Sequence, residues 1–539
     1  MQYLMAIDAG TGSIRAVIFD IEGRQLGCVQ KEWKHNEDSR YPGSMDFDWN
    51  ENWELACSCI KGVLAETGID AAQIAAVSTT CMREGIVLYD EKGAELWACA
   101  NVDARAKDEV TQLKQIDPNL EKELYLKSGQ TFALGALPRL LWVKNKLPEV
   151  YKKTAHLGMI NDWLIYRLSG SLAVEPSNGS TTGLFDLKTR NWDIDIARRC
   201  GLRDDIFPEV KECGTVAAKV STKGAADSGL VEGTPLVTGG GDCQLGTIGV
   251  GVVDVNEAVV FGGSFWQYEF NTGSSLCSPK CDVRVNCHAI ENLWQYEALA
   301  FNPGLVMRWF RDAFCAEEKH LALEKNTDPY ALLDEEAASV PAGSYGMICA
   351  FSDVMNYINW KHASPSFINF DLDPAKYNKV TFYRAIMENS CLVTLGHLRL
   401  VEEATGKRPQ KIVFAGGAAK SALWPQILAD VLGIPVDVPV VKEATALGAA
   451  IMAGKGIGLY TSVKDAARSL VKIEKTFSPN METCEVYDKA YENWRAAYAP
   501  LLKLSDEGVT RYMWSAPGNN GEFGSLVSRI IGEKQYNWA

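Results

Sequence analysis

The first twenty residues already limit the folds open to this chain. Residues 3–9 form an apolar run with a single acid, Asp8, near its end, and residues 13–20 carry apolar side chains at alternating positions. The three residues between them read Gly-Thr-Gly, and Ser13 follows. This pattern predicts two antiparallel strands of a buried sheet, joined by a tight turn.

The turn has the composition of a phosphate-binding loop. Gly10 and Gly12 lack a Cβ, so backbone N–H groups can approach a ligand closely, and the Thr11 and Ser13 hydroxyls can donate to phosphate oxygens. Asp8 offers the oxygen ligand that Mg²⁺ prefers, either directly or through water. A plain hairpin turn explains the same residues and stays open at this point.

Two common nucleotide motifs do not fit. A dinucleotide fingerprint needs a third glycine where Arg15 stands, followed by a helix. A Walker A loop needs Gly-Lys-Ser/Thr, but in the one similar stretch Ala419 precedes Lys420. The hairpin therefore belongs to neither class.

The length and net charge of the chain limit the kinds of molecule that it can bind. With 539 residues, 47% of them apolar, the chain is expected to form two large domains with a cleft between them. The net charge of −14 and the lack of a basic run argue against nucleic-acid binding. No apolar window has the length of a membrane span and no basic flank precedes the first apolar run, so we expect a cytoplasmic protein with a small-molecule partner.

The cysteines indicate reduced thiols. There are 15, an odd number, and most stand in apolar segments. Cys277, Cys281, Cys287 and His288 form the one cluster whose spacing approaches that of metal ligands. Paired C-x-x-C motifs are missing, so a loop with free thiols is favoured over the alternative, a zinc site.

Helices and strands alternate along much of the chain, which predicts a mixed α/β sheet. Helices are expected over residues 50–67, 105–116, 136–146, 161–168, 378–405 and 421–432, strands over 26–32, 74–78, 96–99, 411–415 and 435–438, and a loop over 176–183.

Polar residues follow the strand at 74–78. Ligands of open α/β sheets bind beyond the carboxyl ends of the strands, which places Arg83 and Glu84 to reach a small polyhydroxylated substrate. Asn101 and Asp103 form a second polar cluster after the strand at 96–99. A surface ion pair is the alternative for Arg83 and Glu84.

A strand at 234–238 leads into three glycines and Asp242. Three glycines in a row cost conformational entropy, so they indicate close approach of the backbone to a ligand that Asp242 faces. A helix N-cap would explain the acid but not the glycines.

Residues 257–267 repeat the opening pattern of strand, Gly/Ser turn and strand, with Gly263 and Ser264 in the turn. We interpret this as the start of a second domain. Two such hairpins facing each other can hold the β- and γ-phosphates of ATP from both sides. Later, the small residues of 443–450 predict a helix that packs closely against another and serves as an interdomain element.

Taken together, these stretches resemble the FGGY family of carbohydrate kinases, over roughly residues 3–500. The resemblance implies an α/β fold of two ribonuclease H-like (actin/Hsp70-type) ATPase domains around an interdomain cleft. We expect an N-terminal domain at 1–250 with the substrate site and the first phosphate loop. After it we expect a nucleotide-binding C-terminal domain at 251–510 and a peripheral tail at 511–539.

The resemblance also implies roles for residues, with ATP and Mg²⁺ as cofactors. Asp242 would be the catalytic base and Asp8 would hold Mg²⁺; the acceptor would be bound by Arg83, Glu84, Asn101, Asp103 and Asp242. Nucleotide contacts are implied for Thr11, Gly12, Ser13, Arg15, Gly263, Ser264, Gly304, Arg308, Gly417 and Ser421. Glycine stands at 263 where the family usually has threonine, which removes one hydroxyl contact to the γ-phosphate. A regulatory protein contact, as in some members, is also implied, on a surface that the sequence does not identify.

Residues 81–89, 97–106 and 365–369 are most similar to the branch that phosphorylates the terminal hydroxyl of 4,5-dihydroxypentane-2,3-dione, a quorum-sensing signal. Two alternatives stay open. One is a family member acting on xylulose, ribulose, erythritol or glycerol. The other is an actin-like nucleotide switch without a small acceptor.

Overall fold

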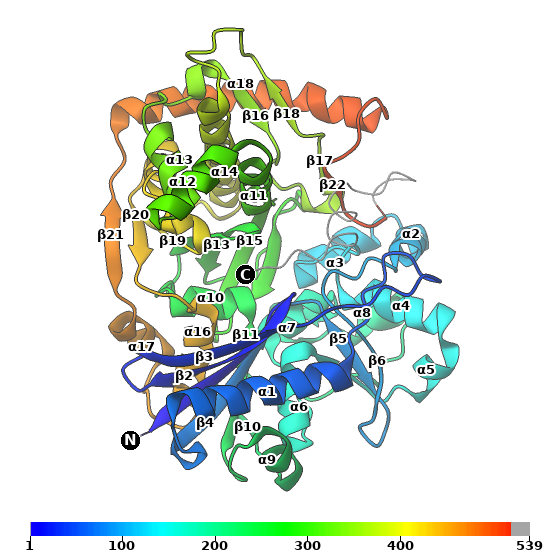
Figure 1. Cartoon of the computed structure of the whole chain (residues 1–539). Coiled ribbons are helices and arrows are strands. Elements are labelled where there is room, and N and C mark those ends of the chain that lie inside the picture. The colour runs from blue at the N-terminus through cyan, green and yellow to red at the C-terminus, as the bar shows by residue number, and fades with distance from the viewer. Residues whose placement is uncertain (1, 519–539) are drawn as a thin grey trace.

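The computed structural model describes residues 2–518, which build two large sheets flanked by helices (Figure 1). The first sheet has the strand order β10-β11-β4-β1-β2-β3. Its strands are β1 (Tyr3–Ala9), β2 (Ser13–Asp20), β3 (Gln25–Glu32), β4 (Ile74–Cys81), β10 (Val216–Lys219) and β11 (Pro235–Gly241). The predicted opening hairpin is confirmed, since β1 pairs antiparallel with β2.

Both faces of this sheet are buried. Met5 and Ile7 face helices α1 (Trp49–Thr67) and α6 (Ile160–Ser169). Leu4 and Ala6 face the opposite way, toward α10 (Asp242–Gly249) and α16 (Ala444–Gly456). Successive side chains of a strand alternate between faces, so a strand covered on both sides must be apolar throughout, as residues 3–9 are except at Asp8.

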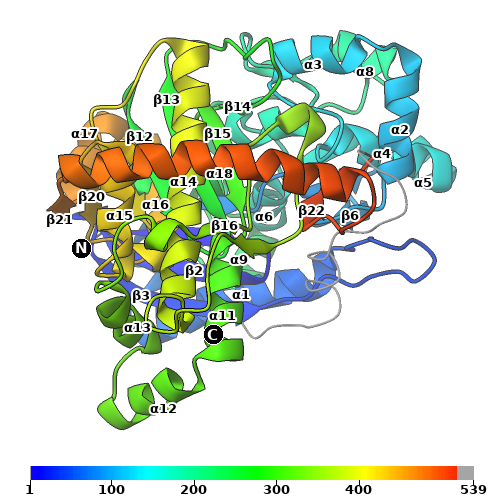
Figure 2. The ribbon, with the colours of Figure 1, turned by 90° about the horizontal axis from the view of Figure 1, so that it is seen from above.

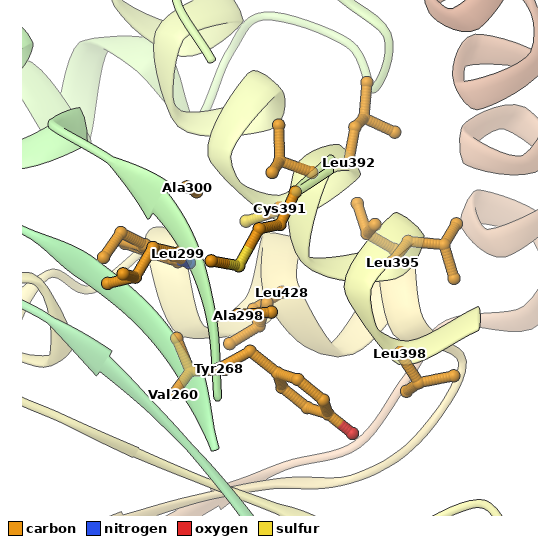
Figure 3. Close-up of a cluster of buried hydrophobic side chains, with 14 of the residues drawn as sticks. Val260, Tyr268, Ala298, Leu299, Ala300, Cys391, Leu392, Leu395, Leu398 and Leu428 are labelled. Carbon is orange, nitrogen blue, oxygen red and sulfur yellow. The ribbon is translucent and has the colours of Figure 1, made fainter. Parts of the chain in front are cut away.

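The second sheet has the order β14-β15-β13-β12-β19-β20-β21. Its strands are β12 (Ala258–Gly262), β13 (Trp266–Thr272), β14 (Arg284–Cys287), β15 (Trp294–Phe301), β19 (Ile412–Ala415), β20 (Val436–Pro439) and β21 (Ile473–Phe477). Helices α14 (Lys379–Thr405) and α15 (Trp424–Leu432) cover one face. There, side chains of the strands, such as Tyr268, meet Cys391 and Leu395 of α14 and Leu428 of α15 (Figure 3).

Helices α10 and α16 pack closely between the two sheets. A Cβ added to Gly448 would lie 2.0 Å from the Leu245 carbonyl oxygen, and one added to Gly249 would lie 1.8 Å from that of Ala444. Glycine is therefore required on both helices at their contact. The close helix packing predicted for residues 443–450 is confirmed.

A lobe built mostly from residues 86–199 lies beside the first sheet (Figure 1). It contains β5 (Ile86–Tyr89), β6 (Glu95–Cys99), β7 (His156–Met159), α2 (Lys107–Ile116), α3 (Leu120–Ser128), α4 (Ala136–Lys146), α5 (Pro148–Lys153) and α8 (Ile194–Arg199), and a small hairpin of β8 (Phe185–Asp186) and β9 (Asn191–Trp192) packs with it. The helices predicted in this part of the chain are found within two residues of their expected ends.

The loop predicted over 176–183 is wrong. These residues form the short helix α7 (Pro176–Gly179) and a 3-10 turn at Ser180–Thr182, and their side chains are buried. The reason is Glu175, whose carboxylate accepts the N–H groups of Ser177 and Asn178 and so caps the helix.

The remaining helices of the second half include α11 (Pro303–Phe314), α12 (Ala316–Lys325), α13 (Pro329–Ala337) and the long α18 (Met481–Asp506), which crosses over α14 in the view from above (Figure 2). Helices α9 (Thr222–Ser228) and α17 (Val463–Leu470) and the strand pair β16 (Ile348–Ala350) and β18 (Ser366–Ile368) complete the two halves.

The predicted tail at 511–539 is only partly described. Strand β22 (Trp514–Ser515) pairs with β17 (Lys361–His362), and Tyr512 and Ala516 are buried. Residues 511–518 are therefore packed on the second half, and residues 519–539 lie outside the described part of the chain.

The structure bears on the state of the cysteines and on the presence of membrane-spanning helices. All 15 cysteines are free thiols, and Cys277, Cys281, Cys287 and His288 do not gather into a metal-ligand group in residues 2–518. Within the same range, none of the helices combines the length and the apolar character needed to span a membrane.

Candidate active site

Three strand ends meet at one edge of the first sheet. Strands β1, β4 and β11 are parallel neighbours, with Asp8 opposite Thr80 and Gly241 opposite Cys81. Asp8, Arg83 and Asp242 therefore all lie at the carboxyl edge of the sheet, where ligands of α/β sheets bind. The structure brings together the predicted metal ligand, a predicted substrate residue and the predicted base.

The turn at residues 10–13, the predicted first phosphate loop, is held from outside by two aromatic rings. Trp33 donates its ring N–H to the Gly10 carbonyl oxygen (2.9 Å), and His35 Nε2 donates to that of Thr11 (2.7 Å). Burial lowers the pKa of His35, so the ring is neutral and keeps this donor role. The predicted substrate residue Asn101 donates to the Thr11 hydroxyl oxygen (3.1 Å) and so contacts the phosphate loop.

Asp8 is buried beside this loop and paired with Arg15. Arg15 Nε lies 3.2 Å from Asp8 Oδ2, and Arg15 Nη1 lies 2.6 Å from Glu443 Oε2, at the start of α16. Burial raises the pKa of Asp8, while the positive charge of Arg15 acts against this effect. A carboxylate next to a glycine-rich turn suits Mg²⁺ beside phosphates, and Arg15 occupies only one of its oxygens.

Asp242 is the first residue of α10, and Gly241, not Asp242, is the N-cap. Its Oδ1 accepts from Arg83 Nε (3.1 Å) and from the Cys243 N–H (2.8 Å). The Asp242 side chain is 39% exposed, so its carboxylate is reachable. Although part of the side chain is exposed, the loss of solvent around the carboxylate raises the pKa of Asp242, and the charge of Arg83 opposes this. The Ser177 hydroxyl accepts the Gly241 N–H (3.0 Å) and fixes the turn before the acid.

Arg83 and Glu84 are not a surface ion pair. Arg83 is 6% exposed and its two terminal nitrogens both contact the Glu297 carboxylate of β15. Glu84 has a left-handed backbone (φ 64°), and its carboxylate lies 2.5 Å from Arg284 Nη2 of β14. Two charged residues of the first half are thus neutralised by two of the second half, which ties the halves together at the site.

Asp103 does not contact the charged cluster of Arg83, Glu84, Arg284 and Glu297. Its Oδ2 accepts the Met45 N–H (2.7 Å) and Arg105 Nε (2.8 Å), and its side chain is fully buried. The carboxylate therefore shapes its own loop, and a direct contact to a substrate is not supported at this position.

The predicted nucleotide stretches of the second half lie next to one another. A Cβ added to Gly304 would lie 2.1 Å from the Gly263 carbonyl oxygen, and one added to Gly416 (φ 97°) would lie 2.8 Å from that of Gly262. Glycine is needed at both points for this approach. Ser264, Gly417 and the half-buried Arg308 belong to the same three segments.

Ser421 is placed differently from its predicted role. Its hydroxyl donates to Asp334 Oδ2 (2.5 Å) and accepts the N–H groups of Leu423 (3.1 Å) and Trp424 (2.9 Å). The side chain therefore holds the start of α15, which is why that helix begins at Trp424 and not at 421.

Sequence reasoning missed several residues at the site: Trp33, His35, Glu269, Arg284, Glu297 and Gln130, whose Oε1 accepts from Arg284 Nε (2.9 Å). The signal for three of them, Glu269, Arg284 and Glu297, lies in their strands. These three stand in buried strands, where an ionisable side chain is expensive to bury without a partner. A charged residue inside a strand is the signal that could have found them.

Comparisons with known proteins agree with this geometry. The N-terminal domain of the FGGY family of carbohydrate kinases matches residues 3–249, and its C-terminal domain matches residues 274–457. Autoinducer-2 kinase of Yersinia enterocolitica is 51% identical over 517 residues, which cover 96% of this chain and 98% of that protein. Autoinducer-2 kinase of Enterobacter sp. strain 638 is 52% identical over 519 residues, with the same coverage.

Solved structures share the fold at lower identity. The xylulose kinase of Rhodospirillum rubrum has a TM-score of 0.82 at 23% identity, covering 93% of this chain and 99% of that one. The glycerol kinase of Plasmodium falciparum with ADP has a TM-score of 0.80 at 20% identity, covering 93% and 98%. With both family domains matched in order and full-length relatives at half identity, the chain belongs to the FGGY family of carbohydrate kinases.

Proposed function

We propose that this enzyme transfers the γ-phosphoryl group of ATP to the terminal hydroxyl of 4,5-dihydroxypentane-2,3-dione, the signal autoinducer-2, in the cytoplasm. The observation that carries the choice of substrate is the 51% identity to autoinducer-2 kinase over 96% of the chain. The chemistry of transfer to an alcohol is supported by the acids and loops at the junction of the two sheets. We also propose that the N-terminal domain spans residues 1–250 and the C-terminal domain residues 251–510.

Asp242 acts as the base in this proposal. Phosphoryl transfer has a loose transition state, so the acceptor hydroxyl loses its proton late, when bonding to phosphorus has made it acidic. A reachable carboxylate is sufficient for that task. Arg83, 3.1 Å from Asp242 Oδ1, holds the acid in place and offers its charge to an oxygen of the acceptor.

The two hairpin loops bind the phosphate chain. Thr11, Gly12 and Ser13 contact it from the first half, and Gly263 and Ser264 from the second, through N–H and hydroxyl donors. Asp8 holds Mg²⁺, directly or through water. When bound, the ion neutralises negative charge on the phosphate oxygens.

The other predicted residues have supporting roles. Gly304, Arg308 and Gly417 line the adenosine end, with Ser421 keeping that segment in shape. Glu84 fixes acceptor oxygens together with Arg83. Asn101 acts through the Thr11 hydroxyl.

The test is ATP consumption by the purified protein with Mg²⁺ and one acceptor at a time: dihydroxypentanedione, xylulose, ribulose, erythritol or glycerol. We expect the highest kcat/KM with dihydroxypentanedione. A higher value with a sugar or with glycerol would overturn the substrate and keep the kinase chemistry. ATP hydrolysis that no acceptor stimulates would favour an actin-like nucleotide switch.

A further inference from the structure

A buried acid without a partner lies next to the proposed acceptor site. Glu269 of β13 is fully buried, and neither of its carboxyl oxygens has a hydrogen-bond partner within residues 2–518. Directly across the sheet from it stands Glu297 of β15, equally buried. A buried polar group without a partner is costly, so an acid retained in this position calls for a ligand.

Glu269 points toward the site and away from the core of the second half. Along β13, Tyr268 and Phe270 pack into the core below α14, so Gln267 and Glu269 face the opposite side. On that side Gln267 Oε1 accepts from the thiol of Cys243 (3.0 Å), the residue after the proposed base. The Cys243 sulfur and the nearest carboxyl oxygens of Glu269 and Glu297 all lie within 4.8 Å of one another.

These three side chains are of types that bind metals, but their neighbours oppose a cation. Arg83 contacts both oxygens of Glu297, and Arg284 Nη1 lies 3.4 Å from one of them. Two guanidinium groups next to the cluster would repel a metal ion. Burial also raises the pKa of the Cys243 thiol, which keeps the proton that it donates to Gln267.

The charges of the two glutamates differ. Burial alone would raise the pKa of Glu297, but Arg83 and Arg284 outweigh it and the pKa is lowered. For Glu269, burial and then the negative charge of Glu297 raise the pKa well above its ordinary value. These directions favour a carboxylate for Glu297 and a protonated, neutral acid for Glu269, whose O–H group has no hydrogen-bond acceptor within residues 2–518.

We propose that Glu269 is a specificity-determining residue whose protonated carboxyl group donates a hydrogen bond to a carbonyl oxygen of the acceptor. This inference rests on the proposed function, because dihydroxypentanedione carries two adjacent carbonyl groups that can only accept. An ionised carboxylate in the same place would repel a carbonyl oxygen and would prefer the hydroxyl groups of a polyol. A carbonyl oxygen depends on a donor such as this neutral acid, whereas a hydroxyl group of a polyol can instead donate to a neighbouring carboxylate such as Glu297. Loss of the donor should therefore cost more with a carbonyl compound than with a polyol of similar size.

Two substitutions separate this role from a structural one. Glu269→Gln keeps the shape, the neutrality and a donor, and we expect kcat/KM for dihydroxypentanedione within about threefold of the wild type. Glu269→Met removes the donor at similar length, and kcat/KM should fall roughly 10- to 100-fold, mostly through KM. With glycerol or erythritol, kcat/KM of Glu269→Met should fall much less. The ratio of kcat/KM for dihydroxypentanedione to kcat/KM for these polyols should therefore change.

Tyr268→Phe is the matched control. It removes a buried hydroxyl without a described partner from the opposite face of the same strand. We expect this variant to keep the acceptor ratio of the wild type. ATP binding by each variant, measured with a fluorescent nucleotide, reports whether the site is folded.

The pH profile gives an independent readout. A donor role requires the protonated acid, so kcat/KM of the wild type should fall as the pH rises through the pKa of Glu269, and this fall should be missing in Glu269→Gln. The charged and titratable groups that face Glu269 are Glu297, Arg83, Arg284, Asp242 and Cys243. Infrared spectra should show the carbonyl band of a buried protonated acid that disappears in Glu269→Gln.

The outcomes separate the two claims. The acceptor preference of the wild type tests the proposed function alone. The inference is overturned if Glu269→Met keeps the wild-type kcat/KM on the preferred acceptor, or if Glu269→Gln loses as much as Glu269→Met while both bind ATP. A preference for another carbonyl acceptor, with the same loss in Glu269→Met, would overturn the proposed substrate and support the role of Glu269.

Discussion

Six strands of each half are arranged in the same spatial order and direction, with β14 as an additional edge strand in the second half, but the chemistry at the edges of the two sheets differs. In each, three antiparallel strands (β1-β2-β3 and β12-β13-β15) are extended by two parallel strands (β4 and β11; β19 and β20) and a final antiparallel one (β10; β21). Each first hairpin turns through a glycine loop, and each last parallel strand leads into one of the two helices packed between the sheets.

The corresponding loop positions differ. In the first hairpin Asp8 pairs with Arg15, whereas Phe261 pairs with Gln267 at the corresponding place in the second. Counted from these pairs, Gly10 and Thr11 of the first loop correspond to Gly263 and Ser264 of the second. Both loops therefore offer a glycine and a hydroxyl group, but only the first hairpin also carries a charged pair. A repeated scaffold positions both loops, but the acid chemistry is concentrated on one of them.

The strongest test of this asymmetry is Asp242→Asn. We expect kcat to fall roughly 10²- to 10⁴-fold while ATP binding is kept, because only the proton acceptor is removed. The acid at the corresponding helix of the second half, Glu443, contacts Arg15 and is the control. If Glu443→Gln costs as much as Asp242→Asn, the assignment of the base to the first half is contradicted.

The pH dependence follows from the same acid. The base must be ionised, so activity is lost as the pH falls through the pKa of Asp242. Burial raises that pKa, so the loss should begin at a higher pH than for an ordinary aspartate. A pH–rate profile of kcat/KM checks this, and the acid limb should be absent from the residual activity of Asp242→Asn.

Asp8→Asn tests whether the acid of the first hairpin binds Mg²⁺. Removing this carboxylate should raise the Mg²⁺ concentration needed for half-maximal activity about 10- to 100-fold. Phe261→Leu, at the corresponding place in the second hairpin, should leave the Mg²⁺ requirement unchanged. A titration of activity with Mg²⁺ measures both, and an equal shift in the two variants would contradict the difference between the loops.

Gly448→Ala tests the helix contact that joins the halves. The added methyl group would meet the Leu245 carbonyl oxygen at 2.0 Å, so the free energy of unfolding should fall by about 1–3 kcal/mol. Lys455→Ala on the same helix should change it by less than about 0.5 kcal/mol. Urea unfolding followed by fluorescence measures both. An unchanged midpoint for Gly448→Ala would show that the helices can separate at little cost.

Gly263→Thr should add a hydroxyl contact to the second loop. The nearest atom to a Cβ at this position is the Phe265 carbonyl oxygen at 3.6 Å, which is an ordinary contact, so the side chain fits. One more hydroxyl donor to the phosphates should lower the KM for ATP about two- to tenfold. Gly263→Ala separates the effect of the hydroxyl from that of the backbone. Equal KM values for the two variants would exclude a hydroxyl contact.

Local patterns predicted most of the scaffold. The alternation at 13–20 and the turn before it gave the first hairpin, and the rule that ligands lie beyond parallel strand ends placed Asp8, Arg83 and Asp242 together. The contacts that were missed cross between distant segments. Glu269 and Glu297 meet only through the register of β13 with β15, which a single strand does not encode.

Other partners that the sequence did not indicate have the same origin. Asp103 and Ser421 stand in polar, loop-like stretches, but their oxygens are taken by Arg105 and Asp334, partners that depend on how the chain folds back. The stretch 176–183 has a loop composition and becomes buried because Glu175 satisfies its backbone donors. Composition predicts where a loop can form, but it does not predict which hydrogen-bonding partners the side chains and backbone groups of that segment will have.

In the proposed reaction, phosphate is transferred to a terminal hydroxyl with Asp242 as the base. The most direct measurement is proton-coupled phosphorus NMR of the product formed from ATP and dihydroxypentanedione. We predict a phosphate ester whose phosphorus couples to the two protons of a CH₂ group, formed by the wild type and not by Asp242→Asn. Coupling to a single proton, inorganic phosphate as the only product, or the same ester at the same rate from Asp242→Asn would contradict the account.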